Sequence, residues 1–298
     1  MLGELMRIVQ LGTAESLAVL GDPEVLVSMV TAGRGEPLFS RERIVEAVKW
    51  RVGALYDRLP LRVRARLADI RARRRAREGV SNFDHERLTR SYVTAWERLL
   101  REDPSAAQGD YLEFGVFYGS SLACMHEARR RLGLSSVRLF GFDSFEGFPD
   151  SADKEPGSTW FPGQCRSSLE LASEYLRKHG VSDESATLVK GWFSDTLTPA
   201  TRERLGIERA SVLMIDCDLY SAARDALRFS APLIGRAAIV YFDDWNAAGI
   251  GDLGEGERRA FEEFLAENPD LRAEPLEGLE YKDKADPRVF LVVRGRTG

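Results

Sequence analysis

Residues 109–147 read GDYLEFGVFYGSSLACMHEARRRLGLSSVRLFGFDSFEG, and this stretch decides the fold. A short apolar run over 110–116 is interrupted at Glu113. It leads through Gly115 and Gly119 into apolar residues that recur at helical spacing. The stretch therefore predicts a strand, a glycine turn and a helix.

A second apolar run, over 137–142, stops on Asp143, which lies 24 residues after Gly119 (143 minus 119). In a right-handed βαβ unit the first loop places backbone N–H groups and a helix N-terminus beside a ligand. An acid at the end of the next strand can accept both hydroxyls of a ribose. This arrangement suits a bound adenosine.

The spacing Glu113-x-Gly115-x-x-x-Gly119 differs from the dinucleotide pattern GxGxxG, which crowds three glycines under a pyrophosphate. Fewer glycines suit a smaller anion, such as the amino-acid end of S-adenosylmethionine (SAM). From these residues alone, a plain βαβ unit with incidental glycines is an equally good interpretation.

Composition describes an ordinary protein with enough apolar residues for a sizeable core. The chain has 298 residues, of which 44% are hydrophobic and 30% charged, and a net charge of −5, so bulk attraction to nucleic acid or membrane is not implied. No apolar run approaches the roughly 20 residues that cross a bilayer, and the first residues lack the features of a secretory signal, so we expect a cytoplasmic location. Three cysteines without CxxC spacing and three scattered histidines predict reduced thiols and argue against a zinc site or a histidine triad.

The first 108 residues predict a helical lid or docking region, because apolar residues recur at helical spacing over 4–20, 41–58, 61–78 and 86–102. The segment 61–78 contains eight arginines. We interpret it as a solvated face, or as a surface facing the acids of another subunit. Nucleic-acid binding is disfavoured because aromatic residues for stacking are missing there.

From residue 109 onward, strands and helices alternate, which predicts an α/β domain with a doubly wound, mostly parallel seven-stranded sheet and the helical region as an N-terminal extension. The expected strands lie at 110–116, 137–142, 186–190, 210–215, 237–242, 271–278 and 288–294. Ser167 and Thr198 are expected to cap helices, and further helices are expected at 221–234 and 255–267. The long loop 144–164 is expected to cover a site.

Four acids follow two neighbouring expected strands: Asp216 and Asp218 after one, Asp243 and Asp244 after the next. Ligands of open parallel sheets sit at the carboxyl ends of strands, so these acids should reach the same crevice. Carboxylates gathered in a partly dry site repel one another unless a cation or shared protons relieve them. Mg²⁺ would suit such oxygen ligands and would acidify a bound hydroxyl. The alternative is that one acid of each pair caps the following helix, for which Asp218 is the best candidate, and that the others are solvated.

Five strings together resemble the macrocin O-methyltransferase family of SAM-dependent enzymes, which methylate sugar hydroxyls of natural products. They are LEFGVFYGSS, FGFDSFEGFP, KGWFSDTL, MIDCDLYSAARDAL and IVYFDDW, and they cover about 109–260. The resemblance implies a class I methyltransferase fold, a small-molecule acceptor with a sugar hydroxyl, and a place in antibiotic or other natural-product biosynthesis.

The resemblance also implies roles for individual residues. The implied SAM contacts are Glu113, Gly115, Phe117, Tyr118 and Gly119, with Asp143 on the ribose and Ser144, Gly191 and Trp192 around the adenosine. The implied ligands of Mg²⁺ or another divalent cation are Asp216, Asp243 and Asp244, with Asp216 also the candidate general base. Two departures stand out: Gly235-Arg236 replaces the family's Gly-Gly, and Trp245, expected to line the acceptor side, replaces its tyrosine.

Three other functions remain open at this point. A metal-independent N-methyltransferase could act on an amino sugar, a dehydrogenase could use the βαβ unit for NAD, and a non-catalytic adenosine-binding protein could dock a partner through its arginine-rich helices. The missing third glycine and the clustered acids argue against the dehydrogenase. Apolar faces in the helical extension favour a homo-oligomer, while the acceptor, the regiochemistry and the metal stay open.

Overall fold

The computed structural model describes residues 59–81, 84–279, 281–282 and 288–295, and the helices expected at 4–20 and 41–58 lie outside them. The chain forms two compact units, residues 1–74 and 75–298. Helix α5 (Leu61–Glu78) coincides with the helix expected there and spans the boundary between the units. Our division into functional domains after residue 108 remains a prediction.

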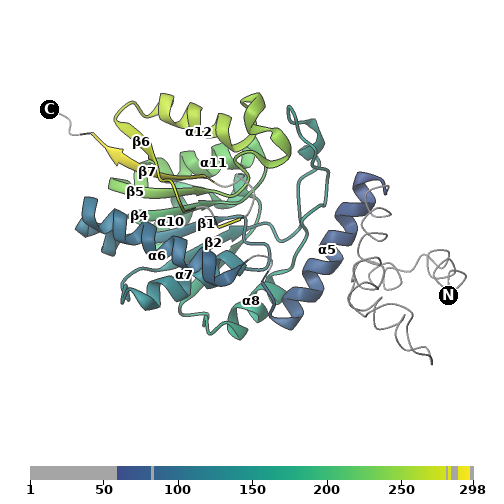
Figure 1. The fold of residues 1–298 in the computed structure, drawn as a ribbon, viewed down its shortest axis with the longest axis horizontal. Coiled ribbons are helices and arrows are strands. Elements are labelled where there is room, and N and C mark those ends of the chain that lie inside the picture. Colours follow the sequence, from purple (N-terminus) through teal and green to yellow (C-terminus); the bar gives the residue numbers. More distant parts are fainter. Residues whose placement is uncertain (1–58, 82–83, 280, 283–287, 296–298) are drawn as a thin grey trace, which may run out of the picture. The chain divides into compact units, whose positions relative to one another are not determined.

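A seven-stranded sheet forms the centre of the second unit, with the strand order β3-β2-β1-β4-β5-β7-β6 (Figure 1). Strand β7 pairs antiparallel with β5 and β6, and the other neighbours pair in parallel. The strands are β1 (Asp110–Phe114), β2 (Leu139–Asp143), β3 (Ala186–Lys190), β4 (Ala210–Ile215), β5 (Ile234–Phe242), β6 (Leu271–Pro275) and β7 (Arg288–Arg294). The expected seven-stranded, doubly wound sheet is confirmed.

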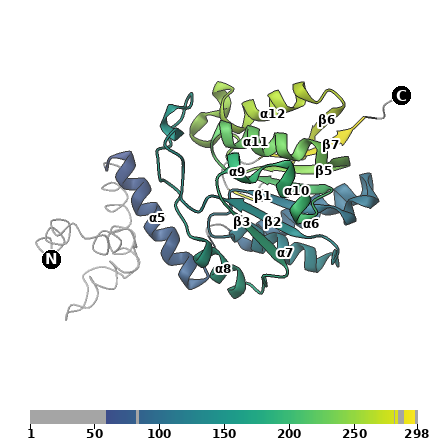
Figure 2. The same ribbon diagram turned by 180° about the vertical axis from the view of Figure 1, so that it is seen from behind.

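Helices cover both faces of this sheet. Figures 1 and 2 show α6 (His85–Glu102), α7 (Ser120–Arg131) and α8 (Leu169–Lys178) on one face, and α10 (Pro199–Leu205), α11 (Tyr220–Ser230) and α12 (Gly256–Glu267) on the other. The short helix α9 (Phe193–Thr196) precedes α10, and 3₁₀ turns lie at Pro104–Gln108, Ala152–Lys154, Ala231–Leu233, Ala247–Gly249 and Gly251–Leu253. The change of face between β3 and β4 follows from right-handed crossovers that run outward from β1 in both directions.

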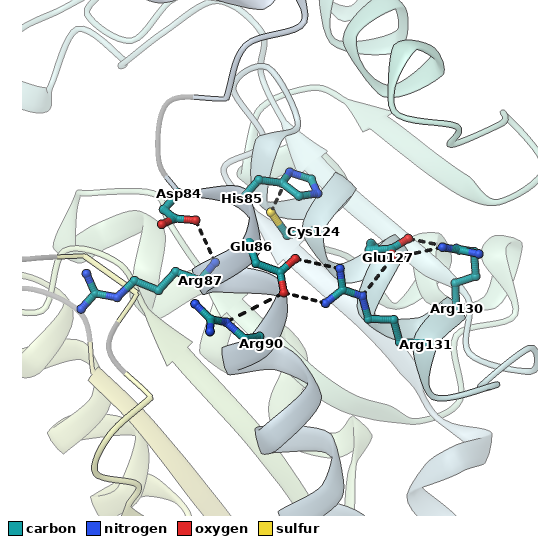
Figure 3. Close-up of polar contacts among 9 residues, drawn as sticks. All are labelled: Asp84, His85, Glu86, Arg87, Arg90, Cys124, Glu127, Arg130 and Arg131. Atoms are coloured by element: carbon teal, nitrogen blue, oxygen red, sulfur yellow. Dashed lines mark hydrogen bonds and ion pairs between the residues drawn. The ribbon is translucent and has the colours of Figure 1, made fainter.

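Helix α6 is an integral part of the second unit, because its apolar face is fully buried. Leu88, Tyr92 and Trp96 have no exposed surface. At its first turn, Glu86 pairs with both terminal nitrogens of Arg131 at 2.9 and 2.8 Å (Figure 3). Since half-exposed ion pairs contribute little, burial of the apolar face supplies most of the stabilisation.

Two helix boundaries differ from the expectation. The cap of α8 is Ser168, whose hydroxyl accepts the N–H of Leu171 at 3.2 Å, and the prediction of Ser167 was one residue early. Helix α11 ends at Ser230, because Pro232 has no N–H to continue the ladder, and β5 begins at Ile234. The predicted cap Thr198 is confirmed by its bond from the N–H of Thr201.

Within the described ranges, none of the helices combines the length and the apolar character that crossing a bilayer requires.

Candidate active site

A cavity of about 720 Å³ opens at the carboxyl ends of the strands. Its wall combines the loop after β1, the end of β2, the ends of β4 and β5, and the long loop after β2. Small-molecule sites in α/β proteins occur at this edge of the sheet and have this size.

Gly115 brings the ends of β1 and β4 into contact. Its φ is 92°, and a Cβ atom there would come within 1.8 Å of the carbonyl oxygen of Asp216. Any side chain at position 115 would therefore push β4 away from β1. Gly119, with φ of 84°, is the capping position of α7 and has no side chain to cap it, so the first N–H groups of this helix can bind an anion.

Asp143 holds the loop between β1 and α7. One carboxylate oxygen accepts the N–H groups of Val116 and Phe117, both at 2.8 Å, and the other accepts the N–H of Phe145 at 2.6 Å. Burial raises the pKa of Asp143, and these three hydrogen bonds oppose the increase. Asp143 also contributes to the cavity wall, where a further acceptor position can face a ligand.

The nine candidates for cofactor contact divide into residues that line the cavity and residues that do not. Five of them line the cavity, namely Gly115, Phe117, Asp143, Ser144 and Trp192. As far as the structure describes the chain, the other four do not contribute to its wall, namely Glu113, Tyr118, Gly119 and Gly191.

Glu113 lies behind the cavity with no exposed surface. Its two oxygens accept hydrogen bonds from the hydroxyls of Tyr111, at 2.5 Å, and Ser121, at 2.6 Å. Burial raises the pKa of Glu113 to about 8, so its carboxyl is largely protonated at neutral pH. In this state Glu113 ties strand β1 to the first turn of α7.

Asp216, Asp243 and Asp244 converge in the cavity wall. One carboxylate oxygen from each lies within 4.8 Å of those from the other two. Adjacent parallel strands bring them together, because Ile215 at the end of β4 pairs with Phe242 at the end of β5. Burial and repulsion from neighbouring acids raise the pKa values of Asp216 and Asp244 well above the usual range.

Asp218 does not cap α11, so the capping prediction was wrong. The residue has φ of 62°, and the capping position is Leu219, which has no side-chain acceptor. Glu155 from the long loop takes the role, since its carboxylate accepts the N–H of Ser221 at 3.2 Å. Asp218 instead lines the cavity, and burial together with repulsion from Asp243 raises its pKa to about 7.

Sequence analysis missed three partners of the acid cluster. The ammonium group of Lys282 contacts one oxygen of Asp243, and the hydroxyl of Tyr281 donates to the other. Glu257, which is fully buried, accepts the N–H of Asp244 at 3.0 Å. Lys282 and Tyr281 precede β7, and no sequence pattern links them to β5.

The cluster has the donor set of a site for a hard divalent cation. Its three converging groups are all carboxylates, the ligands that Mg²⁺ prefers together with water. Among the described residues of the cavity wall, Lys282 is the one cation that offsets them. An additional cation would relieve the repulsion that raises the pKa values of these acids.

A family model described as Macrocin-O-methyltransferase (TylF) matches residues 45–269, which is most of the chain. The chain belongs to this macrocin O-methyltransferase family. It is 32% identical over 143 residues to the 8-demethyl-8-(2,3-dimethoxy-α-L-rhamnosyl)-tetracenomycin-C 4′-O-methyltransferase of Streptomyces olivaceus, over 46% of this chain and 53% of that protein. It is 30% identical over 148 residues to the mycinamicin III 3″-O-methyltransferase of Micromonospora griseorubida, over 46% of this chain and 55% of that protein.

The matched part spans about half the length of these curated relatives. Among solved structures, the calicheamicin methyltransferase CalS11 is similar, with a TM-score of 0.53 and 22% identity over 88% of this chain and 98% of that chain. The likeness confirms the class I methyltransferase fold of this family member.

Trp245, the departure expected to line the acceptor side, does not contribute to the wall of the cavity as far as the structure describes it. It packs against an aromatic cluster, with ring centroids 5.2 Å from Phe242, 6.0 Å from Phe261 and 5.1 Å from Phe290. These contacts place the ring between β5, α12 and β7, and a role for Trp245 on the acceptor side stays a prediction. Arg236, the other departure, is exposed, and its guanidinium group lies 3.3 Å from the carboxylate of Glu102.

Proposed function

We propose that this chain catalyses SAM-dependent transfer of a methyl group to a hydroxyl of a glycosylated natural product or a similar small molecule. The observation that carries the proposal is the convergence of Asp216, Asp243 and Asp244 in the same cavity wall as Gly115 and Asp143. The names of the matched relatives support it, since both describe O-methyl transfer and one names a rhamnosyl acceptor.

The proposed cofactor site follows the loop that Asp143 holds. The carboxylate of SAM would bind near the uncapped first turn of α7, and the loop over Gly115, Phe117 and Tyr118 would contact its methionine part. Asp143 would accept the ribose hydroxyls, and Ser144, Gly191 and Trp192 would surround the adenine. Glu113 would act from behind the loop, through Ser121, because its oxygens are already engaged.

The proposed metal ligands are Asp216, Asp243 and Asp244. A divalent cation such as Mg²⁺, when bound there, would orient the acceptor hydroxyl and lower its pKa. The fit rests on the carboxylate donors and on the mutual repulsion that a cation relieves.

The residues of the chain have two tasks in this reaction. The cavity wall brings the acceptor oxygen into line with the sulfur–methyl bond of SAM, and positioning of this kind supplies roughly 7–11 kcal/mol of barrier reduction. Asp216 accepts the hydroxyl proton as the oxygen–carbon bond forms and the carbon–sulfur bond breaks, which leaves S-adenosylhomocysteine. A positioned base contributes about 10²- to 10⁴-fold.

One observation favours a second candidate, a methyltransferase that acts without a metal. Lys282 already places a positive charge on Asp243, so the cluster has a partial counter-ion of its own. An amine acceptor would need no acidification of this kind. Persistence of turnover in a chelator would select this candidate.

The proposal is tested by calorimetric titration with S-adenosylhomocysteine, followed by incubation with SAM, Mg²⁺ and a panel of glycosylated polyketides. We expect binding of S-adenosylhomocysteine and a mass increase of one methylene on a sugar hydroxyl. Absence of S-adenosylhomocysteine binding would exclude the proposed function.

A further inference from the structure

Both oxygens of Asp243 are engaged by neighbouring residues of one short segment. The hydroxyl of Tyr281 donates to one oxygen, and the ammonium group of Lys282 contacts the other. The side chain of Lys282 is 30% exposed and contributes to the cavity wall together with Asp216 and Asp244. A divalent cation would need a free carboxylate oxygen of Asp243, and the ammonium group of Lys282 occupies one of the two.

We propose that Lys282 is an internal counter-ion that competes with the divalent cation for Asp243, so that metal binding requires its ammonium group to leave this carboxylate. This inference rests on the proposed function, because it assumes that the three acids bind a dication. The physical reason is that two cations on one carboxylate oxygen repel each other, while each alone stabilises the cluster.

The chain that precedes Lys282 is held at Leu279 and Tyr281, so we assign the exchange to the lysine side chain. The preceding residue, Tyr281, is only 2% exposed. The carbonyl of Leu279 accepts the hydroxyl of Ser91 at 2.7 Å, and Ser91 also bonds to the hydroxyl of Tyr241 at 3.0 Å. A lysine side chain has a flexible stem of four carbons. It can turn its ammonium group into the open cavity while the contacts of Leu279 and Tyr281 stay in place.

The consequence is a threshold for metal binding. Without Lys282 no ammonium group would occupy Asp243, and the cluster would bind any available dication more tightly. With Lys282 one ammonium group offsets part of the negative charge at low metal concentration, and a cation must displace it from Asp243 before it gains all three carboxylates.

The test is a titration with Mn²⁺ alone, in the absence of SAM and acceptor. The electron paramagnetic resonance signal of free Mn²⁺ monitors how much of the ion is bound. The full chain is compared with Lys282→Met, Lys282→Arg and the exposed-site control Lys190→Met. We expect Lys282→Met to bind Mn²⁺ about tenfold more tightly or better, the effect of removing one like charge next to a dication. Lys282→Arg keeps the charge and should resemble the parent, as should Lys190→Met.

Thermal unfolding gives a second readout. Lys282→Met should unfold at lower temperature than the parent in EDTA, and should gain more from added Mn²⁺, because a ligand that binds more tightly stabilises the folded state more. If Lys282→Met does not fold in EDTA, Lys282→Gln, purified in Mn²⁺, allows the same comparison.

The outcomes separate the two proposals. If the parent binds Mn²⁺ and Lys282→Met binds it equally or more weakly, the competition is refuted and the metal site stands. If neither binds Mn²⁺, both the competition and the metal-dependent part of the proposed function are refuted. Tighter binding by Lys282→Arg as well would show that charge is not the cause.

Discussion

Gly115 and Asp216 meet backbone to backbone, at a distance that leaves only 1.8 Å between a Cβ atom at position 115 and the Asp216 carbonyl oxygen. This contact joins the loop proposed for the cofactor to the strand that presents the proposed base. A change at either residue should therefore affect both parts of the site.

Substitution of Gly115 by alanine should lower stability and weaken binding of S-adenosylhomocysteine. The added methyl group must displace β4, and the residue also has a φ of 92°, which is unfavourable for alanine. We expect a loss of about 3 kcal/mol or more in the free energy of unfolding, measured by urea titration.

Gly163→Ala is the matched control for that variant. Gly163 also has a positive φ, 74°, but a Cβ atom there meets nothing within 4 Å. It should lose only about 1–2 kcal/mol, the penalty for a left-handed alanine. Equal losses in the two variants would mean that the contact with Asp216 is unimportant.

Asp243→Asn should abolish methyl transfer and leave binding of S-adenosylhomocysteine within about twofold. The substitution removes one carboxylate of the proposed metal site, and the residue directly follows β5, apart from the loop that Asp143 holds. Asp183→Asn, at an exposed acid, serves as the control. Parallel loss of turnover and cofactor binding in calorimetry would assign Asp243 a structural role.

Glu113→Gln should change how stability depends on pH. Glu113 has a pKa of about 8 in the folded protein, raised by burial from 4.5. Between these values the folded state holds a proton that the unfolded chain has released, so its stability falls as pH rises, by up to about 1.4 kcal/mol per unit.

Glutamine mimics the neutral acid and removes this dependence. In urea titrations at pH 6, 7 and 8, the free energy of unfolding of the variant should increase relative to that of the parent as pH rises. Identical slopes for the two proteins would contradict a protonated Glu113, and the other buried acids cancel in the comparison.

Removal of metal should stop turnover if the proposed mechanism holds. Dialysis against EDTA is expected to reduce methyl transfer to the level of Asp243→Asn, and Mg²⁺ should restore it. Binding of S-adenosylhomocysteine, measured in the same samples, should persist because its proposed contacts come from other residues. Turnover that survives EDTA would select the metal-independent candidate.

The fold was predictable from sequence because its signals are local. Glycines at 115 and 119, apolar runs of strand length and helical spacing between them specify the βαβ units without reference to distant residues. Cap positions were less predictable, since Glu155 caps α11 from a loop more than sixty residues away.

The residues of the candidate site were predictable only where they directly follow a strand. Asp216, Asp243 and Asp244 come directly after two adjacent strands, and their carboxylates converge as expected. Lys282 and Glu257 reach the cluster through tertiary contacts that no spacing in the chain encodes. The packing of Trp245 against Phe261 and Phe290 was unpredictable for the same reason, because it depends on the assembled fold.

The three backbone hydrogen bonds to Asp143 have a kinetic consequence. They set the glycine loop before a cofactor arrives, so association should need no slow rearrangement of that loop and little ordering entropy. Rapid mixing with SAM should then give a single exponential whose rate rises linearly with cofactor concentration, as for a rigid receptor.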